Sequence, residues 1–234
     1  MTEWFSRTEM LIGKSGVEKL KKSKVAVFGI GGVGSFTAEA LARAGIGKLI
    51  LVDNDKIALT NINRQIHALN KTLGKYKTEV MKERILNINP FAEVCCINEF
   101  VLYNNVEDII KTDIDYIVDA LDTITAKIAI VKTAKSKNIE VISCMGTGNK
   151  LYPELLEISD IYKTSVCPLA RVMRHELKKN GIDSLKVVYS KEKPILPLYT
   201  EESANKRNTP GSISFVPSCA GLIIAGFVVR KLLE

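Results

Sequence analysis

Residues 25–34 of this 234-residue chain read VAVFGIGGVG and join two different local patterns. Residues 25–30 are mainly apolar and carry two valines and an isoleucine, which predicts a buried strand. From residue 33 to residue 44 apolar side chains recur at roughly helical spacing, and Gly45 follows, which predicts a helix ended by a glycine. A strand, a glycine-rich turn and a helix in this order are typical of the first unit of a parallel α/β sheet.

The alternation of short apolar runs and helix-like stretches continues to about residue 148. The predicted strands are residues 48–52, 94–97, 116–118 and 141–144, and the predicted helices are residues 75–86 and 125–137. Strands that alternate with helices form a parallel sheet covered on both faces. We therefore expect an α/β fold with a Rossmann-like, mostly parallel sheet and helices on both faces.

The pattern changes after residue 148. Two further strands are predicted at residues 155–158 and 185–189, with a basic helix at residues 169–179 and an apolar closing helix at residues 221–233. Residues 191–211 hold three prolines and many polar side chains, which predicts an ordered crossover or a mobile lid. We expect one domain over residues 1–234, with a nucleotide-binding half (1–148) and a substrate-binding half (149–234).

Composition excludes several classes of protein. Thirty-three Lys and Arg against 26 Asp and Glu give a net charge of +7, which attracts polyanions without naming one. Five cysteines without CxxC spacing argue against a disulfide framework and a four-thiolate zinc site, and two histidines exclude a three-histidine zinc site. The longest apolar run, residues 220–229, is closed by Arg230 and Lys231 and predicts a buried helix rather than a membrane span. With no signal peptide apparent, we expect a cytoplasmic protein without a membrane partner.

The glycine-rich turn is the first candidate binding element. GIGGVG matches GxGxxG at Gly29, Gly31 and Gly34, with Gly32 between them, and lies between a predicted strand and a predicted helix, where the pattern indicates a phosphate site. Free N–H groups and the positive end of the helix would stabilise the phosphate. Asp53 ends the next strand and could accept hydrogen bonds from ribose hydroxyls. These features fit NAD and ATP equally.

Cations and amides beyond that strand favour a triphosphate. Arg64 and Lys77 supply more positive charge than a diphosphate held by the glycine loop needs, and Asn61 and Gln65 add amide groups. Asp122 follows the predicted strand at residues 116–118, at the sheet edge where Mg²⁺ bound to a triphosphate would lie. The alternative is that the cations are solvated surface charges and that Asp122 caps the next helix. An NAD-binding oxidoreductase or a non-catalytic nucleotide-binding module therefore stays open.

Six short motifs carry a family resemblance over about residues 7–145. They are GIGGVGS (29–35), the pair Asp53 and Asp55, TNINRQ (60–65), GKYK (74–77), INP (88–90) and DALDT-x-x-x-K (119–127). In this order they resemble the nucleotide site of the ubiquitin-activating-like superfamily that includes ThiF and MoeB. The resemblance implies that the protein binds ATP and Mg²⁺ and transfers AMP to a carboxylate, with release of pyrophosphate.

The second half resembles one branch of that superfamily. MGTGNK (145–150), DIYKTSVCPLAR (160–171) and GSISFVPS (211–218) are similar to the tRNA threonylcarbamoyladenosine dehydratases. That similarity implies ATP-dependent cyclisation of threonylcarbamoyladenosine in tRNA, through adenylation of the threonyl carboxylate, by a homodimer. The alternative is a ThiF-like or MoeB-like enzyme that activates the C-terminus of a sulfur-carrier protein, although the paired CxxC motifs typical of that branch are missing.

The resemblance also assigns roles to individual residues. It implies that Arg64 and Lys77 contact the phosphates, that Asp122 orders Mg²⁺, and that Arg7 reaches the ATP of a neighbouring subunit; an exposed charge on an N-terminal helix is the alternative for Arg7. Cys167 precedes a proline at a predicted helix start, so it is either a reactive thiol or a small apolar filler. A cysteine desulfurase or another sulfur-relay protein stays open as a partner.

The basic helix is the candidate tRNA contact. Arg171, Arg174, Lys178 and Lys179 can share one broad face at helical spacing, where they could bind RNA phosphates. A solvated helix face is the alternative.

Overall fold

A single sheet runs through the described residues of the computed structural model, which are 4–198 and 210–234. Its strands lie in the order β3-β2-β1-β4-β5-β7-β6. Their bounds are β1 Lys24–Phe28, β2 Lys48–Val52, β3 Glu93–Ile97, β4 Tyr116–Asp119, β5 Glu140–Cys144, β6 Leu156–Asp160 and β7 Lys186–Ser190. All neighbours pair in parallel except β6, which runs antiparallel to β7 at the edge. The mostly parallel α/β sheet is therefore confirmed.

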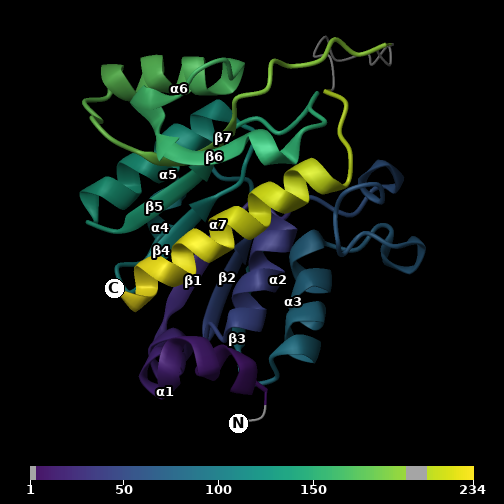
Figure 1. Cartoon of the computed structure of the whole chain (residues 1–234), viewed down its shortest axis with the longest axis vertical. Helices are drawn as coiled ribbons and strands as arrows, with labels where there is room; N and C mark the ends of the chain where they lie inside the picture. The colour runs from purple at the N-terminus through teal and green to yellow at the C-terminus, as the bar shows by residue number, and fades with distance from the viewer. Residues whose placement is uncertain (1–3, 199–209) are drawn as a thin grey trace.

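Helices cover both faces of this sheet (Figure 1). Their bounds are α1 Ser6–Lys22, α2 Gly34–Ala44, α3 Lys77–Ile88, α4 Val106–Ile109, α5 Ile124–Ser136, α6 Pro168–Lys179 and α7 Phe215–Leu233. One apolar cluster joins a face of the sheet to α1, α2, α3 and α7, and a second joins the opposite face to α4, α5 and α6. Short 3₁₀ helices fill several connections, at Leu59–Asn61, Asn70–Thr72, Pro153–Leu155 and Ile161–Lys163.

The strand order places a crevice beside β1. The chain passes from β1 outward to β2 and β3, then returns to the other side of β1 with β4 and β5. The connections after β1 and β4 therefore leave in opposite directions, and ligands of open α/β sheets bind at the carboxyl end of such a switch point. The glycine loop follows β1 and Asp122 follows β4, so both lie at this crevice.

The sequence predicted the strands more closely than the helix ends. The prediction for residues 48–52 matches β2, whereas α3 begins at Lys77 instead of residue 75. Helix α1 was expected only as the N-terminal helix in the alternative for Arg7 and was given no bounds, because Gly13 breaks it with a φ of 73° and many of its residues are polar. Helix α7 begins six residues before the predicted start at Gly221, and its Pro217 lies in the first turn, where no helical N–H is required.

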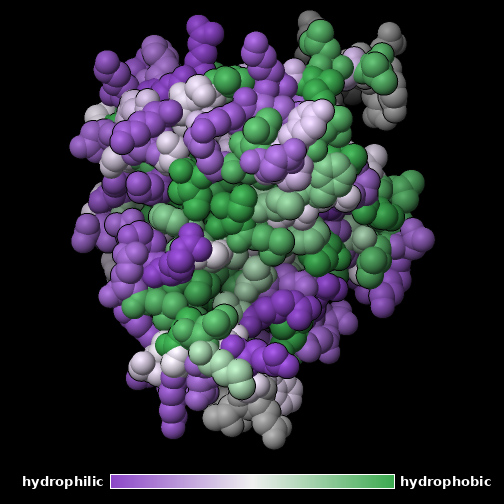
Figure 2. All heavy atoms as spheres, viewed as in Figure 1, coloured by the Kyte–Doolittle hydropathy of each residue, from purple (hydrophilic) through white to green (hydrophobic). Residues whose placement is uncertain are grey.

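Helix α7 packs as a core helix on one face only. It is the one helix in residues 4–198 and 210–234 that is long and apolar enough to cross a membrane by length and composition. Its residues Ala220, Ile224 and Val228 are fully buried, and the Thr37 hydroxyl of α2 donates to the Gly221 carbonyl at 3.1 Å. The other face shows exposed apolar side chains such as Leu222, and hydrophobic residues gather along this helix in Figure 2.

The two faces of α7 predict effects of different size when an apolar side chain is truncated to alanine. Ile224→Ala should lower the free energy of unfolding by about 2–5 kcal/mol, because it opens a cavity in the core beneath α7. Leu222→Ala, two residues away with a side chain 53% exposed, should change it by less than about 1 kcal/mol. Urea unfolding followed by circular dichroism measures both, and equal effects would contradict the packing of α7 described above.

Candidate active site at the carboxyl edge of the sheet

The glycine loop packs directly on the turn that follows β4. Gly29 has a φ of +85°, and a Cβ at this position would lie 2.7 Å from the carbonyl oxygen of Ala120. A Cβ at Gly34 would lie 1.7 Å from the carbonyl oxygen of Gly29. Side chains are therefore excluded at both positions, and the backbone of the loop reaches the β4 edge unobstructed.

Helix α2 begins directly behind this loop and leaves donors unused. In residues 4–198 and 210–234, the N–H groups of Gly32, Val33 and Gly34 have no hydrogen-bond acceptor. These N–H groups carry the positive partial charge of the helix end. The loop is therefore a preformed anion site suited to phosphate.

Residues 60–65 lie against the same loop. The ideal Cβ position of Gly31 is 3.9 Å from the side-chain nitrogen of Gln65, and that of Gly32 is 3.4 Å from Cγ of Arg64. Burial lowers the pKa of Arg64 from its ordinary value, but a guanidinium still carries its charge near neutral pH. Its Nη1 donates to the Thr60 carbonyl at 2.8 Å, which orients the side chain. Asn61 holds the start of this turn, since its side-chain oxygen accepts from the N–H of Ala58 at 3.0 Å.

A group of charged side chains, of which Asp53 and Lys77 are buried and Asp55 is exposed, lies on the β2 side of the crevice. The Asp53 carboxylate accepts from the N–H of Ile30 at 2.7 Å and from that of Asp55 at 2.8 Å, so it fixes the glycine loop to the end of β2. Lys77 at the start of α3 lies 2.6 Å from the Asp55 carboxylate and 3.8 Å from Asp53. Burial raises the pKa of Asp53, and the charge of Lys77 opposes that rise. The structure thus brings Asp53, Asp55 and Lys77 together beside the loop.

Asp122 is free to take a ligand. It is exposed at the end of β4, and in the described residues its side chain makes one long contact, 3.4 Å from the Thr123 hydroxyl. The alternative prediction that Asp122 caps the following helix is wrong, because α5 has Thr123 at its N-cap and no side-chain cap bond. A carboxylate of this kind, together with phosphate oxygens, fits the oxygen ligands that Mg²⁺ prefers.

Sequence reasoning missed the apolar crevice at the carboxyl ends of β2, β3 and β4. It is lined by Val52, Asp53, Asn54, Glu99, Phe100, Val101, Leu121, Thr123 and Ala126. Its apolar side chains lie beside Asp53, the predicted ribose contact. The residues at 99–101 follow the end of β3 without a recognisable motif, so only the sheet order could reveal them.

The second half of the chain meets the phosphate loop. A Cβ at Gly32 would lie 3.2 Å from Pro217, and the side-chain nitrogen of Asn63 donates to the Ser212 carbonyl at 3.0 Å. Asn149, in the loop after β5, binds Gly211 through its backbone N–H and its side-chain oxygen, both at 2.7 Å. The segments that distinguish the second half therefore border the nucleotide crevice, and the part of the predicted crossover at residues 199–209 lies outside the described residues.

Cys167 is at the start of a helix, as predicted, but its thiol is shielded. It forms the N-cap of α6 and is 2% exposed. Val166 before it has a φ of +61°, a left-handed conformation that is strained for a β-branched residue. Nearby, Lys150 is also buried, and its ammonium donates to the Glu192 carbonyl at 2.7 Å. Burial of the thiol supports the packing interpretation of Cys167.

The predicted basic face of α6 is only partly free. Arg171 and Lys178 are exposed, whereas Arg174 donates to the Thr164 carbonyl at 3.1 Å and Lys179 pairs with Glu176 at 3.1 Å. Hydrophilic side chains cover this end of the molecule in Figure 2. Arg171 and Lys178 are therefore the least constrained cations of the four.

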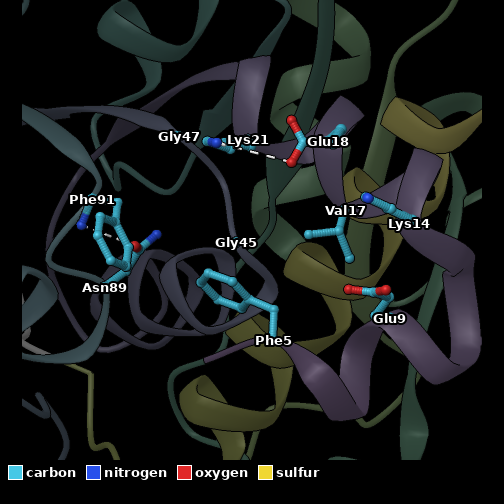
Figure 3. Close-up of a pocket in the computed structure, with 10 residues that line it drawn as sticks. All are labelled: Phe5, Glu9, Lys14, Val17, Glu18, Lys21, Gly45, Gly47, Asn89 and Phe91. Carbon is cyan, nitrogen blue, oxygen red and sulfur yellow. Dashed lines mark hydrogen bonds and ion pairs between the residues drawn. The ribbon is translucent and has the colours of Figure 1, made fainter. Parts of the chain in front are cut away.

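Arg7 lies far from the crevice of its own chain. It is exposed on α1, which packs at the amino edge of the sheet, where Phe5 lies beside Gly45 and Trp4 contacts Phe91. A five-residue strand separates the two edges by about 16 Å. The hollow in Figure 3, which is lined by Phe5 before α1 and by α1 residues such as Val17, lies at this amino edge and not at the nucleotide crevice.

The fold and the crevice define a class of nucleotide-binding α/β protein, and comparison with known proteins names it. The family model described as "ThiF family" matches residues 5–233, so the chain belongs to the ThiF family. It is 45% identical to a tRNA threonylcarbamoyladenosine dehydratase of Bacillus subtilis, over 100% of this chain and 96% of the relative. A Haemophilus influenzae relative of the same name is 37% identical, over 92% of this chain and 88% of its own.

Solved structures agree with this assignment. The Escherichia coli tRNA N6-threonylcarbamoyladenosine dehydratase TcdA, in complex with ATP, superposes with a TM-score of 0.91 at 32% identity, over 99% of this chain and 94% of that one. The same enzyme in complex with AMP gives a TM-score of 0.90. The predicted resemblance to this branch of the superfamily is confirmed.

His67, a residue without a predicted role in the site, lies buried behind the glycine loop. It is 1% exposed, and neither ring nitrogen has a hydrogen-bond partner in the described residues. Burial lowers the pKa of His67 to about 4, and the positive charges of Lys77 and Arg84 add to this effect. The imidazole is therefore neutral in the folded protein at neutral pH.

This histidine predicts loss of stability in acid. Between pH 6.5 and pH 4 the unfolded chain binds a proton at residue 67 that the folded chain does not, so the stability present above pH 6.5 falls by about 3 kcal/mol as the pH drops to 4. His67→Leu should remove that part of the pH dependence, measured as unfolding free energies at pH 7 and pH 4. His175→Leu, at an exposed position, is the control, and an unchanged pH dependence in His67→Leu would contradict the prediction.

Proposed function

We propose that the protein dehydrates threonylcarbamoyladenosine in tRNA, using ATP to activate the threonyl carboxylate. The observation that carries the proposal is the crevice itself: unused N–H donors, Arg64, Lys77 and Asp122 converge there from separate segments, and second-half segments similar to the dehydratases border it. Relatives that match nearly the whole chain are named as this enzyme. We propose that residues 1–148 bind the nucleotide and that residues 149–234 bind the substrate.

The proposed reaction activates a carboxylate, which otherwise reacts poorly for two reasons. A carboxylate is a poor electrophile, and its oxygen is a poor leaving group. Attack of the threonyl carboxylate on the α-phosphorus of ATP gives an acyl-adenylate and pyrophosphate. The carbamoyl group of the same side chain then closes on the activated carbonyl, expels AMP and forms a five-membered ring. Because both reacting groups belong to one molecule, positioning supplies much of the rate.

The residues of the crevice would divide this work. The glycine-loop N–H groups and Arg64 neutralise the negative charge that develops on the phosphates. Lys77 would exchange its contact with Asp55 for a phosphate oxygen, while Asp53 keeps the loop in place and faces the ribose. Asp122 would hold Mg²⁺, which shields the triphosphate charge when it is bound. No sulfur atom takes part in these steps, so the proposed reaction requires no sulfur-relay partner.

We propose that the enzyme is a homodimer and that Arg7 acts on the partner's site. Arg7 is at the opposite edge of the sheet from its own crevice, yet α1 packs beside α7, whose outer face is apolar. An apolar face of this kind is suited to contact with a second subunit. The tRNA would then lie across α6, where Arg171 and Lys178 are exposed. Since ATP and tRNA are cytoplasmic, we place the enzyme in the cytoplasm.

The activity is tested by incubating the protein with ATP, Mg²⁺ and tRNA that contains threonylcarbamoyladenosine. Nucleoside mass spectrometry should show loss of one water, with release of AMP and pyrophosphate. Arg64→Ala should lower the rate about 100-fold, because it removes a preorganised cation from the phosphates. Stimulation of ATP–pyrophosphate exchange by a ubiquitin-like sulfur carrier, and not by this tRNA, would instead indicate the sulfur-carrier branch.

Subunit mixing tests the role of Arg7. Arg7→Ala and Arg64→Ala should each be nearly inactive alone, because every site then lacks one of the two arginines. After the two variants are mixed and allowed to exchange subunits, half the dimers are mixed and each has one complete site. The mixture should therefore recover about a quarter of the wild-type rate. No recovery, with mixed dimers shown by native mass spectrometry, would place Arg7 outside the partner's site.

A further inference from the structure

A buried ammonium joins the ends of two central strands. Lys127 on α5 is 0% exposed, and its Nζ donates to Asp119 at 2.8 Å, to the Ser143 hydroxyl at 3.0 Å and to the Cys144 carbonyl at 2.9 Å. Asp119 ends β4, and Ser143 and Cys144 end β5. All three N–H groups of the ammonium are therefore used, and all point at the carboxyl edge of the sheet.

Asp119 connects the Lys127 ammonium to the turn after β4, beside the proposed nucleotide site. Oδ1 of Asp119 accepts from the N–H of Leu121 at 3.2 Å. Oδ2, which accepts from Lys127, also accepts from the Ser143 hydroxyl at 2.5 Å. The turn it holds contains Ala120, whose carbonyl touches Gly29, and leads into Asp122. The carboxylate thus fixes the turn that supports both the phosphate loop and the proposed Mg²⁺ ligand.

Cys144 connects the Lys127 ammonium to the loop after β5, beside the proposed substrate-binding half. Its carbonyl accepts from Lys127, and the chain then enters the loop at residues 145–149, which binds Gly211 through Asn149. One ammonium therefore sets the distance between the turn before Asp122 and the loop that borders the second half of the chain.

Stability alone does not explain a buried ion pair at this place. Desolvation of both charges offsets most of their attraction, and well-packed apolar side chains of similar volume are often as stable. A fixed arrangement of charged and hydrogen-bonded groups gives a unique geometry instead. Displacement of reacting groups by about 1 Å can cost about 100-fold in rate.

We infer that Lys127 is a positioning residue that, through Asp119 and Cys144, holds the nucleotide turn and the substrate loop in register for adenylation. This inference rests on the proposed function. It requires that ATP still binds when the cluster is neutralised, because Asp53 still holds the glycine loop to the end of β2, and Arg64 and Lys77 lie outside the cluster. Adenylation, which requires ATP and the tRNA together, is the step that should become slower.

The test is the double variant Asp119→Asn with Lys127→Met, which removes both charges and leaves neither one unpaired. The matched control is Lys132→Met, the same replacement at an exposed position of α5. For each protein we would measure the melting temperature, the Kd for ATP by calorimetry, and single-turnover AMP formation per folded molecule with saturating ATP and substrate tRNA. The wild type is measured first. If it forms no AMP with this tRNA, the proposed function is wrong, and this result is distinct from any result obtained with the variants.

With active wild type, the double variant should form AMP about 10- to 100-fold more slowly, with a Kd for ATP within about threefold of wild type. Lys132→Met should match wild type in all three measurements. If the double variant does not fold, Ser143→Ala is the second variant, because it keeps the ion pair. We expect it to form AMP about threefold or more slowly than wild type, with a wild-type melting temperature. A wild-type rate per folded molecule in either folded variant would overturn the inference and leave Lys127 a structural residue.

Discussion

The close approach of two backbones at the centre of the sheet is the constraint on which the site depends. Gly29 and Gly34 have no side chains, so the loop after β1 can touch the turn after β4 at Ala120. This contact puts the N-terminus of α2 at the switch point, and the unused N–H groups there make an anion site. A single Cβ at Gly34 would overlap the Gly29 carbonyl and push the loop away from β4.

Charge is gathered around that loop from distant parts of the chain. Arg64 packs beside Gly32, Lys77 pairs with Asp55 at the end of β2, and Asp122 follows β4. The positive groups lie where phosphate would bind, and the free carboxylate lies where a divalent cation bound to phosphate would need an oxygen ligand. The diphosphate of a dinucleotide, held by the glycine loop, does not need this additional positive charge, so the arrangement favours a triphosphate.

The local patterns of the sequence predicted most of the scaffold. Alternating apolar and amphipathic segments fix strands such as β2 and their parallel arrangement, because periodicity and β-branched content act over a few residues. The bounds of helix α1 were not predicted, because Gly13 and the polar composition of the helix hide the pattern. The apolar crevice at residues 99–101 was also missed, since its lining comes from loops whose proximity depends on strand order. The roles of Arg171, Arg174, Lys178 and Lys179 stay predictions.

The sequence by itself determined the class of fold, the phosphate loop and the family, because these depend on motifs whose residues are close together in the chain. Only the tertiary structure decided that Pro217 and Ser212 border the nucleotide crevice, that the Cys167 thiol is shielded, that Arg7 lies at the opposite edge from its own site, and that Lys127 joins β4 to β5. Such contacts join residues far apart in the chain, and their existence depends on how the strands are ordered and how closely the backbones pack.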